Sequence, residues 1–181
     1  MSVKITYFAS GTTTDHEQHI SSGWNDVELS EDGISQSWEL TEQTDALKFD
    51  VVFCSNLKRA IDSAEITWGG AYPIMQDARL RGCNYGDLNG QSDEVVESVF
   101  AKAISTPFPN GESLEMVKVR MESFLKHLKT NYDGKHVAIV GHRTTQLALE
   151  VILQGKSWED ALATDWRTVG VWKPGFEYTV A

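Results

Sequence analysis

The chain has 181 residues, and its 26 acidic side chains outnumber the 16 basic ones, which gives a formal charge of −10 at pH 7. This charge excludes the basic surface that nucleic acids need, so we expect no nucleic-acid partner. The length and a hydrophobic fraction of 41% indicate one globular domain, residues 1–181, with a real core. The longest apolar runs fall far short of the roughly 20 residues of a membrane span, so we expect a soluble protein with no membrane partner.

The N-terminus shows no export signal, and two cysteines are too few for a disulfide framework. We therefore expect a cytoplasmic protein. Cys54 falls inside an apolar run, whereas Cys83 falls in a loop-rich stretch. Only Cys83 is expected to react with a thiol reagent.

Residues 3–8 are rich in β-branched and aromatic side chains and predict a first strand. A T-x-x-E pattern follows, with Thr14 as the cap and Glu17 three residues later, which predicts the start of a short helix. This pattern places His16 on a helix surface. Ser30 is expected to cap the second helix. The apolar positions predicted for the buried side of that helix are Ile34, Trp38 and Leu47.

Residues 49–54 and 136–141 read as buried strands, each followed by a helix. The first of these helices starts near residue 56 and stops at the glycines 69–70, and the second covers residues 143–153 and closes at Gly155. Between them lie a loop-rich stretch and two further helices, at residues 77–90, 93–104 and 112–131. The expected apolar face of the longest helix is Leu114, Val117, Met121, Phe124, Leu125 and Leu128.

Residues 168–172 and 176–180 are separated by a Lys-Pro-Gly turn and predict a C-terminal hairpin. Across the whole chain, strands alternate with helices. This order predicts an α/β fold, a three-layer sandwich whose mostly parallel central sheet is flanked by helices on both faces.

Ligands of such sheets bind beyond the carboxyl ends of the strands, where helices begin. The residues to expect there are Ser10, residues 55–59 and His142. Arg59 offers a donor fork suited to phosphate or carboxylate, although a surface salt bridge would also explain it. His142 directly follows a strand and fits either an acid or base role or a hydrogen-bonded core position. Arg143 either deepens an anion site or is solvated.

His16 and His19 stand three residues apart, but this spacing is too loose for a metal pair, and no metal or organic cofactor is expected. Ser10 alone fits a turn residue.

Six stretches in chain order resemble the histidine phosphatase superfamily, which has the phosphoglycerate-mutase-like fold. Residues 5–13 stand where that family has its first strand and RHG-x-T motif. Residues 23–33 are similar to G-W-x-D-x-x-L-x-x-x-G, and residues 53–65 are similar to S-S-x-L-x-R-A-x-x-T-A. Residues 79–90, 108–113 and 140–142 continue the order.

The resemblance implies phosphoryl transfer onto a histidine that is held by two arginines, a second histidine and backbone amides. Carried onto this chain, the second arginine is Arg59 and the second histidine is His142. The chain departs from the pattern at four positions, where the family has the first arginine, the nucleophilic histidine, an asparagine and a loop carboxylate. Those positions hold Ala9, Ser10, His16 and Gly82.

Three functions remain open at this stage. The preferred one is an enzyme that acts on a small anionic or polar metabolite by isomerisation, elimination or cyclisation, with His142 as general acid or base and His16 as a second proton-transfer group. The second is an atypical phosphomonoester hydrolase, including one engineered from histidine to serine at Ser10. The third is a ligand-binding pseudoenzyme.

A phosphoryl- or acyl-transfer pair of Ser10 with His142 as its base is a further alternative, but no orienting carboxylate can be named for it. The expected substrate-binding residues are Arg59, Arg143, Gly11, Thr13 and Arg81, and the expected partner is a small anionic or phosphorylated molecule. Whether the chain forms a homodimer is left open.

Overall fold

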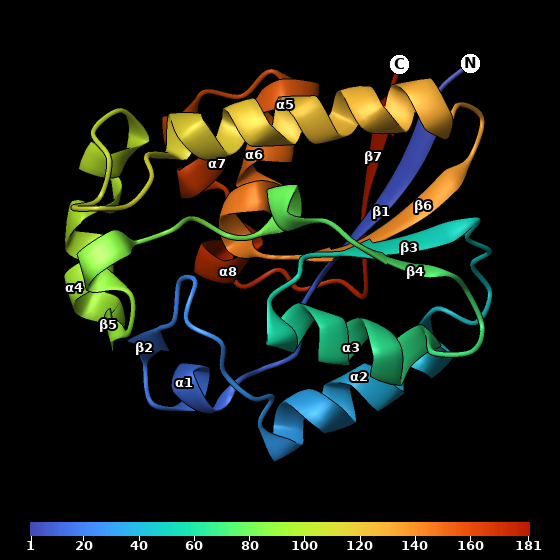
Figure 1. Cartoon of the computed structure of the whole chain (residues 1–181), viewed down its shortest axis with the longest axis horizontal. Helices are drawn as coiled ribbons and strands as arrows, with labels where there is room; N and C mark the ends of the chain where they lie inside the picture. The colour runs from blue at the N-terminus through green and yellow to red at the C-terminus, as the bar shows by residue number, and fades with distance from the viewer.

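The computed structural model describes residues 1–181, and its centre is a five-stranded sheet of order β4-β3-β6-β1-β7. Four of the strands run parallel, and β7 pairs antiparallel with β1. Helices cover both faces of this sheet, as the sequence predicts (Figure 1). The strands are β1 (Val3–Ala9), β3 (Val51–Cys54), β4 (Ile74–Gln76), β6 (His136–Gly141) and β7 (Phe176–Val180).

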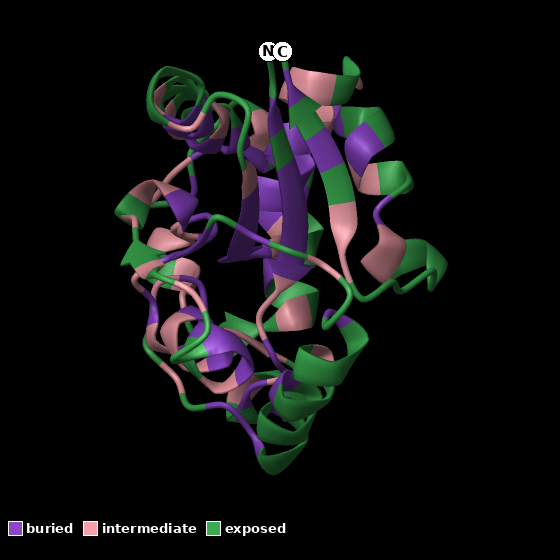
Figure 2. Cartoon of the chain, turned by 90° about the vertical axis from the view of Figure 1, so that its right-hand side faces the viewer, coloured by how far each residue is buried: buried purple, intermediate pink, exposed green.

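The sheet interior is buried on both sides, which is typical of parallel sheets between helical layers (Figure 2). Val3 at the start of the chain faces Val180 at its end, so the two termini leave the sheet side by side. Strand β4 was not predicted, because Pro73 and a partly exposed three-residue run give it little strand signal.

One face of the sheet carries α5 (Leu114–Asn131), α6 (Arg143–Gln154) and α7 (Trp158–Ala163) over a cluster of 26 buried apolar residues. The other face carries α2 (Glu31–Gln43) and α3 (Lys58–Trp68) over a smaller cluster of nine. All six residues predicted for the apolar face of α5 are buried, so that prediction is confirmed.

The predicted apolar face of α2 is wrong. Ile34 and Trp38 are exposed, Trp38 by 62%, and the helix ends at Gln43, before Leu47. The buried side instead carries Gly33 and Ser37. A Cβ atom on Gly33 would lie 2.0 Å from the carbonyl oxygen of Thr12, so the absence of a side chain permits this contact between helix and loop.

The predicted C-terminal hairpin is also wrong. Residues 166–169 form a short helix, α8 (Trp166–Val169), and β7 pairs with β1 instead of folding back on residues 168–172. Asp165 explains the difference, because its side chain accepts a hydrogen bond from the backbone N–H of Arg167 and caps the helix. A capping signal therefore outweighs the β-branched residues that suggested a strand.

The cap of α1 (Thr14–Glu17) lies one residue earlier than predicted. Thr13 caps this helix by accepting from the backbone N–H of His16, and His16 Nδ1 accepts in return from the backbone N–H of Thr13. His16 thus takes the role that the pattern assigns to Glu17.

The middle of the chain is loop-rich, as predicted, and is held by short elements. A two-stranded ribbon joins β2 (Ile20–Ser21) to β5 (Gln91–Ser92). The helical pieces are η1 (Ala78–Leu80), η2 (Gly86–Leu88), α4 (Asp93–Phe100) and η3 (Lys102–Ile104).

The prediction that Cys83 is accessible is wrong. Its side chain is buried, and burial raises the pKa of its thiol to about 12. No helix combines the length and the apolar character that a membrane crossing requires.

Candidate functional site

The ends of three parallel strands bring polar side chains to one edge of the sheet. Ser10 follows β1, Ser55 follows β3 and His142 follows β6. The backbone N–H of Ser10 donates to Gly141 (3.3 Å), and that of Ser55 donates to Val140 (3.2 Å), so the strand pairing continues to the edge. His142 then occupies the N-cap position of α6.

A cavity of about 400 Å³ opens at this edge, and we call it the strand-end cavity. Three arginines and two histidines contribute to its wall, together with the acidic side chains of Asp93 and Glu97. Its lining comes from β1, the α1 to β2 segment, α3, the central loop, α4, α6 and α8. The residues at the wall are Ala9, Ser10, His16, residues 20–23, Arg59, Gly82, Cys83, Tyr85, Asp93, Glu97, residues 141–144 and Arg167.

His142 is 8% exposed and is fixed on one side of its ring. Its Nε2 lies 2.6 Å from Ser55 Oγ, and its backbone N–H donates to the hydroxyl of Tyr7 at 2.9 Å. The His142 side chain also takes part in the capping box at the start of α6, and the residue lines the cavity wall. Burial, and secondarily the nearby cation of Arg59, hold the pKa of His142 well below its usual value. The ring is therefore neutral at pH 7.

Arg59 is a buried cation without a carboxylate partner. It is 6% exposed, and its two terminal nitrogens donate to the carbonyl oxygens of Gly23 (2.8 Å) and Asn25 (3.2 Å). No ion pair includes it, and burial lowers its pKa. A guanidinium keeps its charge at neutral pH. Arg59 consequently presents to the cavity a positive charge that forms no ion pair within the protein.

The other two cavity arginines are neutralised. Asp165 has a side chain with no exposed surface, and it pairs with Nε of Arg143 at 2.9 Å and with Arg167 at 3.1 Å. Arg143 also pairs with Glu97. Two carboxylates thus balance these two cations, which leaves Arg59 as the principal site for an incoming anion.

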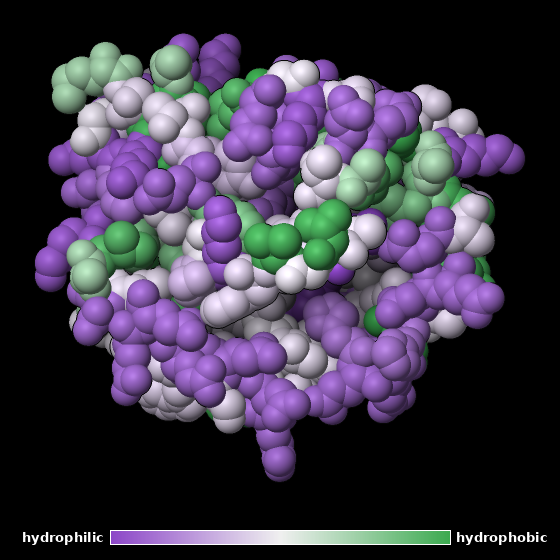
Figure 3. All heavy atoms as spheres, turned by 180° about the vertical axis from the view of Figure 1, so that it is seen from behind, coloured by the Kyte–Doolittle hydropathy of each residue, from purple (hydrophilic) through white to green (hydrophobic).

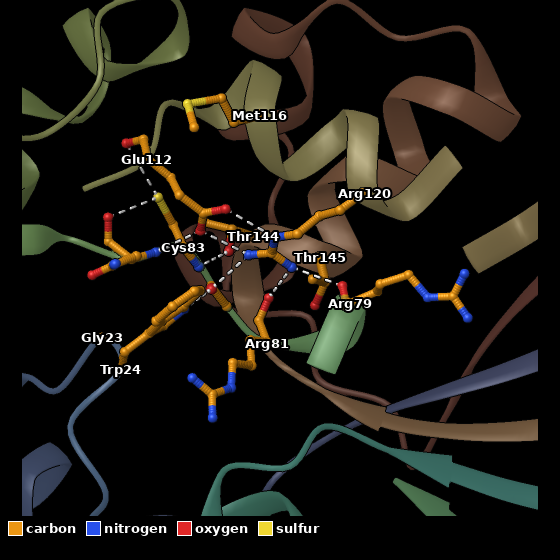
Figure 4. A network of polar contacts seen from close by, with 12 residues as sticks. Gly23, Trp24, Arg79, Arg81, Cys83, Glu112, Met116, Arg120, Thr144 and Thr145 are labelled. Carbon is orange, nitrogen blue, oxygen red and sulfur yellow. Dashed lines mark hydrogen bonds and ion pairs between the residues drawn. The ribbon is translucent and has the colours of Figure 1, made fainter. Parts of the chain in front are cut away.

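A second arginine cluster, behind the cavity wall, fixes the central loop (Figure 4). Arg120 donates to the carbonyl oxygens of Arg79, Arg81 and Gly82 at 2.6–2.8 Å, and it forms two bonds of 3.0 Å with the carboxylate of Glu112. All five of its N–H groups are therefore used. The loop that carries Gly82 is held rigidly against His142.

Gly82 occupies the position where the resemblance expects a carboxylate. A Cβ atom there would lie 3.0 Å from Cβ of His142, closer than ordinary van der Waals contact. Its carbonyl oxygen accepts from Trp24 Nε1 and from Arg120. A larger side chain at this position would have to displace His142, because Arg120 holds the loop in place.

The structure brings five of the predicted site residues to the strand-end cavity, namely Ser10, His16, Arg59, His142 and Arg143. No hydrogen bond joins Ser10 to His142, whose Nε2 is bonded to Ser55 instead. His16 lies exposed at the rim, where desolvation and the charge of Arg59 lower its pKa.

Three predicted binding residues lie outside this cavity. Gly11 donates its backbone N–H to Ser63 Oγ, and the side chain of Thr13 caps α1. The guanidinium of Arg81 points away from the loop and packs 4.8 Å from the ring of Trp24 (Figure 4). None of the three lines the strand-end cavity, and their part in binding stays a prediction.

The sequence reasoning missed Ser55 as a partner of His142, and it missed Arg167 and its carboxylate Asp165. The strand predicted over residues 168–172 leaves Arg167 without a place at a helix start. The D-W-R sequence at residues 165–167, in which an aspartate precedes a helix, is the signal that would have found them. No group of three or more His, Cys, Asp or Glu side chains is arranged to hold a metal ion.

Comparison with known proteins agrees with this architecture. The family model described as histidine phosphatase superfamily (branch 1) matches residues 10–174. The 2,3-bisphosphoglycerate-dependent phosphoglycerate mutase of Cytophaga hutchinsonii is 33% identical over an alignment 168 residues long, which covers 83% of this chain and 77% of that protein.

Two solved structures share the fold. YhfR of Bacillus stearothermophilus superposes with a TM-score of 0.79 and is 24% identical, covering 88% of this chain and 83% of its own. The alpha-ribazole phosphatase of Shigella flexneri has a TM-score of 0.79 and is 23% identical, with coverage of 88% and 84%.

Proposed function

Because the chain belongs to the histidine phosphatase superfamily, we propose that it is an enzyme of small-molecule metabolism whose chemistry does not pass through a phosphohistidine. The observation that carries this proposal is that Arg59 and His142 are both retained in the strand-end cavity, whereas Ser10 stands at the nucleophile position. The proposed reactions are isomerisation, elimination or cyclisation.

Arg59 supplies the anion site. A charged group that enters the cavity exchanges water for a guanidinium that already lacks a carboxylate partner, so no internal ion pair must first be broken. A phosphate or carboxylate of a small metabolite fits this requirement. The superfamily's characteristic phosphoryl group is one such anion, so a phosphorylated substrate remains compatible with an altered reaction.

His142 supplies the base. We assign to His142 the tautomer that carries hydrogen on Nε2, in which the ring donates to Ser55 Oγ and Nδ1 is the proton acceptor of the proposed reaction. Ser55 thereby orients the base. A substrate held by Arg59 would lose a proton from carbon or oxygen to Nδ1, and that proton would return at another atom in an isomerisation or to the leaving group in an elimination.

His16 fits a supporting role. Its Nδ1 accepts from the backbone N–H of Thr13, so the neutral ring carries its hydrogen on Nε2. That N–H is available to donate a hydrogen bond to a substrate oxygen at the cavity rim. We therefore propose that His142 removes the proton and His16 stabilises the charge that develops on oxygen.

Phosphoryl transfer is disfavoured because three of its groups are missing together. Ser10 has no base bonded to its hydroxyl, Ala9 offers no cation, and Gly82 offers no carboxylate. Loss of one transition-state donor costs about 10² to 10³ in rate, and removal of the covalent nucleophile closes the two-step route. An atypical phosphomonoester hydrolase is therefore the weaker reading.

The test is mass spectrometry of a metabolite extract incubated with the wild-type protein and with His142→Asn. Asparagine is a favourable N-cap residue, so this variant preserves the start of α6. His127→Asn is the matched control, because His127 lies on α5 and lines neither the strand-end cavity nor its wall. We expect a product that the wild type and the control make and that His142→Asn does not.

The mass of the product separates the readings. A product lighter by water, or a product of equal mass in which no phosphoryl group has moved, supports the proposed chemistry. A product lighter by HPO₃ would establish a phosphatase and overturn the proposal.

A ligand-binding pseudoenzyme is the second candidate, and one observation favours it. The pKa of His142 lies well below its usual value, which makes the ring a weak base. This reading is supported if a metabolite is retained by the wild type without turnover and His142→Asn changes only its affinity.

A further inference from the structure

A second cavity, of about 470 Å³, lies beside the first, and we call it the tail cavity. Its walls are the middle and end of α2, the end of β1, two residues of α3, and the segment from α8 to β7. The face of the molecule opposite to that of Figure 1 is mostly hydrophilic and has only small apolar patches (Figure 3). The proposed acid and base chemistry does not use the tail cavity.

The two cavities share a wall. Ala9 and Ser10 line both of them, and both side chains are small. The resemblance places an arginine and a histidine at these two positions, and both of those side chains are much larger. Ser10 makes no side-chain hydrogen bond within the protein, so its hydroxyl is free for a ligand that crosses this wall. Loss of the two family residues thus lowers the barrier between the cavities.

Trp172 offers a free aromatic face to the tail cavity. It is 57% exposed and packs against no other aromatic ring. Trp166, in contrast, is stacked on Phe176 at 5.5 Å and covered by the guanidinium of Arg167 at 4.3 Å. Only Trp172 is therefore available to stack on a planar ring.

Polar side chains of α2 face the same space. Gln36, Glu39 and Gln43 lie on one side of the helix at spacings of three and four residues, and all three line the tail cavity. The side chain of Gln36 is bonded to Thr12, whereas the side chains of Glu39 and Gln43 make no hydrogen bond within the protein. The carboxylate of Glu39 and the amide of Gln43 can form hydrogen bonds with the edge of a nitrogen heterocycle, and the indole of Trp172 can stack on its face.

We propose that a single ligand spans both cavities, with its anionic group on Arg59 and a planar nitrogen heterocycle in the tail cavity against Trp172. The ligand class is then a mononucleotide or a compound of the same design. This inference rests on the proposed function for the anion site, and it adds the identity of the other end of the ligand. Ser10 lies at the junction and contacts the linking part.

The experiment is a calorimetric titration with four probes, namely inorganic phosphate, ribose 5-phosphate, adenosine 5′-monophosphate and cytidine 5′-monophosphate. The variant is Trp172→Ala, which removes the free ring. The control is Trp38→Ala, because Trp38 is a comparably exposed tryptophan on α2 that lines neither cavity. Both positions are exposed, so both variants are expected to fold.

We expect the wild type and Trp38→Ala to bind at least one mononucleotide about tenfold more tightly than ribose 5-phosphate, which is the effect of stacking one base on an aromatic ring. Trp172→Ala should abolish that preference and leave the affinity for ribose 5-phosphate unchanged. Equal affinities of the wild type for all three sugar phosphates would overturn the inference. A preference that survives in Trp172→Ala would overturn it as well.

The proposed function fails in a different way. Arg59→Gln should weaken every phosphorylated probe alike, and if it binds ribose 5-phosphate as the wild type does, the anion site is wrong. If the wild type binds none of the four probes, both the anion site and the inference are wrong. The titrations of the wild type measure binding alone and do not depend on turnover. A failure of turnover therefore leaves the binding result intact.

Discussion

Arg120 and Arg59 are both largely buried arginines, but the protein supplies them with different hydrogen-bond partners. Arg120 uses all five of its N–H groups, on three carbonyl oxygens and the carboxylate of Glu112. Arg59 reaches two carbonyl oxygens and no carboxylate. The charge of Arg120 is therefore paired within the fold, whereas the charge of Arg59 is left for an incoming anion.

The contrast separates structural arginines from binding arginines without reference to family motifs. A buried charge is costly unless it is paired, so a fold retains an unpaired one where a ligand supplies the partner. The loop that Arg120 fixes is the loop that carries Gly82 and Cys83 to the cavity wall. Arg120 therefore fixes the wall of the strand-end cavity, and Arg59, which has no carboxylate partner, faces the interior of that cavity.

Arg120→Met should produce the largest effect on stability. It leaves Glu112 largely buried without its cation and the carbonyl oxygens of Arg79 and Arg81 without the donor that Arg120 supplies, and we expect the free energy of unfolding to fall by about 3–5 kcal/mol. Urea unfolding measures this change. Arg79→Met is the control, because Arg79 pairs with Asp77 at a more exposed position and should cost at most about 1 kcal/mol. Equal losses in the two variants would remove the distinction drawn for Arg120.

Arg59→Gln should do the reverse, with little effect on stability and a large one on binding. We expect the affinity for phosphate to fall about 100-fold, since a charge-assisted hydrogen-bond pair is lost. The measurement is the shift of the melting temperature with added phosphate, which should vanish in this variant. Arg81→Gln is the control, because Arg81 also lacks a carboxylate but packs on Trp24 outside the cavity. If both variants respond to phosphate as the wild type does, Arg59 is a structural residue after all.

The sequence was sufficient for the fold where periodicity and burial agree. The long helix α5 and the buried strand β6 were both predicted, because apolar residues recur there with the spacing of their element. Prediction failed where close backbone packing determines which face of a helix is buried, or where a capping residue determines where a helix starts. Gly33 lets α2 lie against Thr12, which turns Trp38 outward, and Asp165 starts a helix where the residues after it suggest a strand.

The sequence could predict those site residues whose position follows from the ends of neighbouring parallel strands. His142 and Ser10 follow neighbouring strands, so their proximity follows from a parallel sheet. The contrast between Arg59 and Arg143 was beyond the sequence, because it depends on which carboxylates reach each guanidinium. Glu97 and Asp165 approach Arg143 from segments 46 and 22 residues away in the chain. The place of Arg81 was beyond the sequence for the same reason, since its motif does not reveal that its side chain packs on Trp24.

The pH dependence of stability gives the smallest effect, and it tests whether Arg59 and His142 form one site. Burial lowers the pKa of His142, and the charge of Arg59 is the next cause, ahead of that of Arg120. A histidine whose folded pKa lies below its unfolded value of about 6.5 binds its proton only in the unfolded chain, so stability is full above that pH. Stability should then fall as the pH drops from about 6.5 toward the folded pKa, by at most about 1.4 kcal/mol per pH unit for this residue.

Urea unfolding between pH 7.5 and about pH 5 measures this slope in the wild type and in His142→Asn, in which the contribution of His142 should disappear while those of His16 and His136 remain. Arg59→Gln should fall between the two, because it removes one of the charges that disfavour protonation of the ring. Arg81→Gln should keep the wild-type slope, because Arg81 is not among the charges that lower the pKa of His142. If Arg59→Gln also keeps that slope, its guanidinium does not act on His142, and the two residues do not form one site.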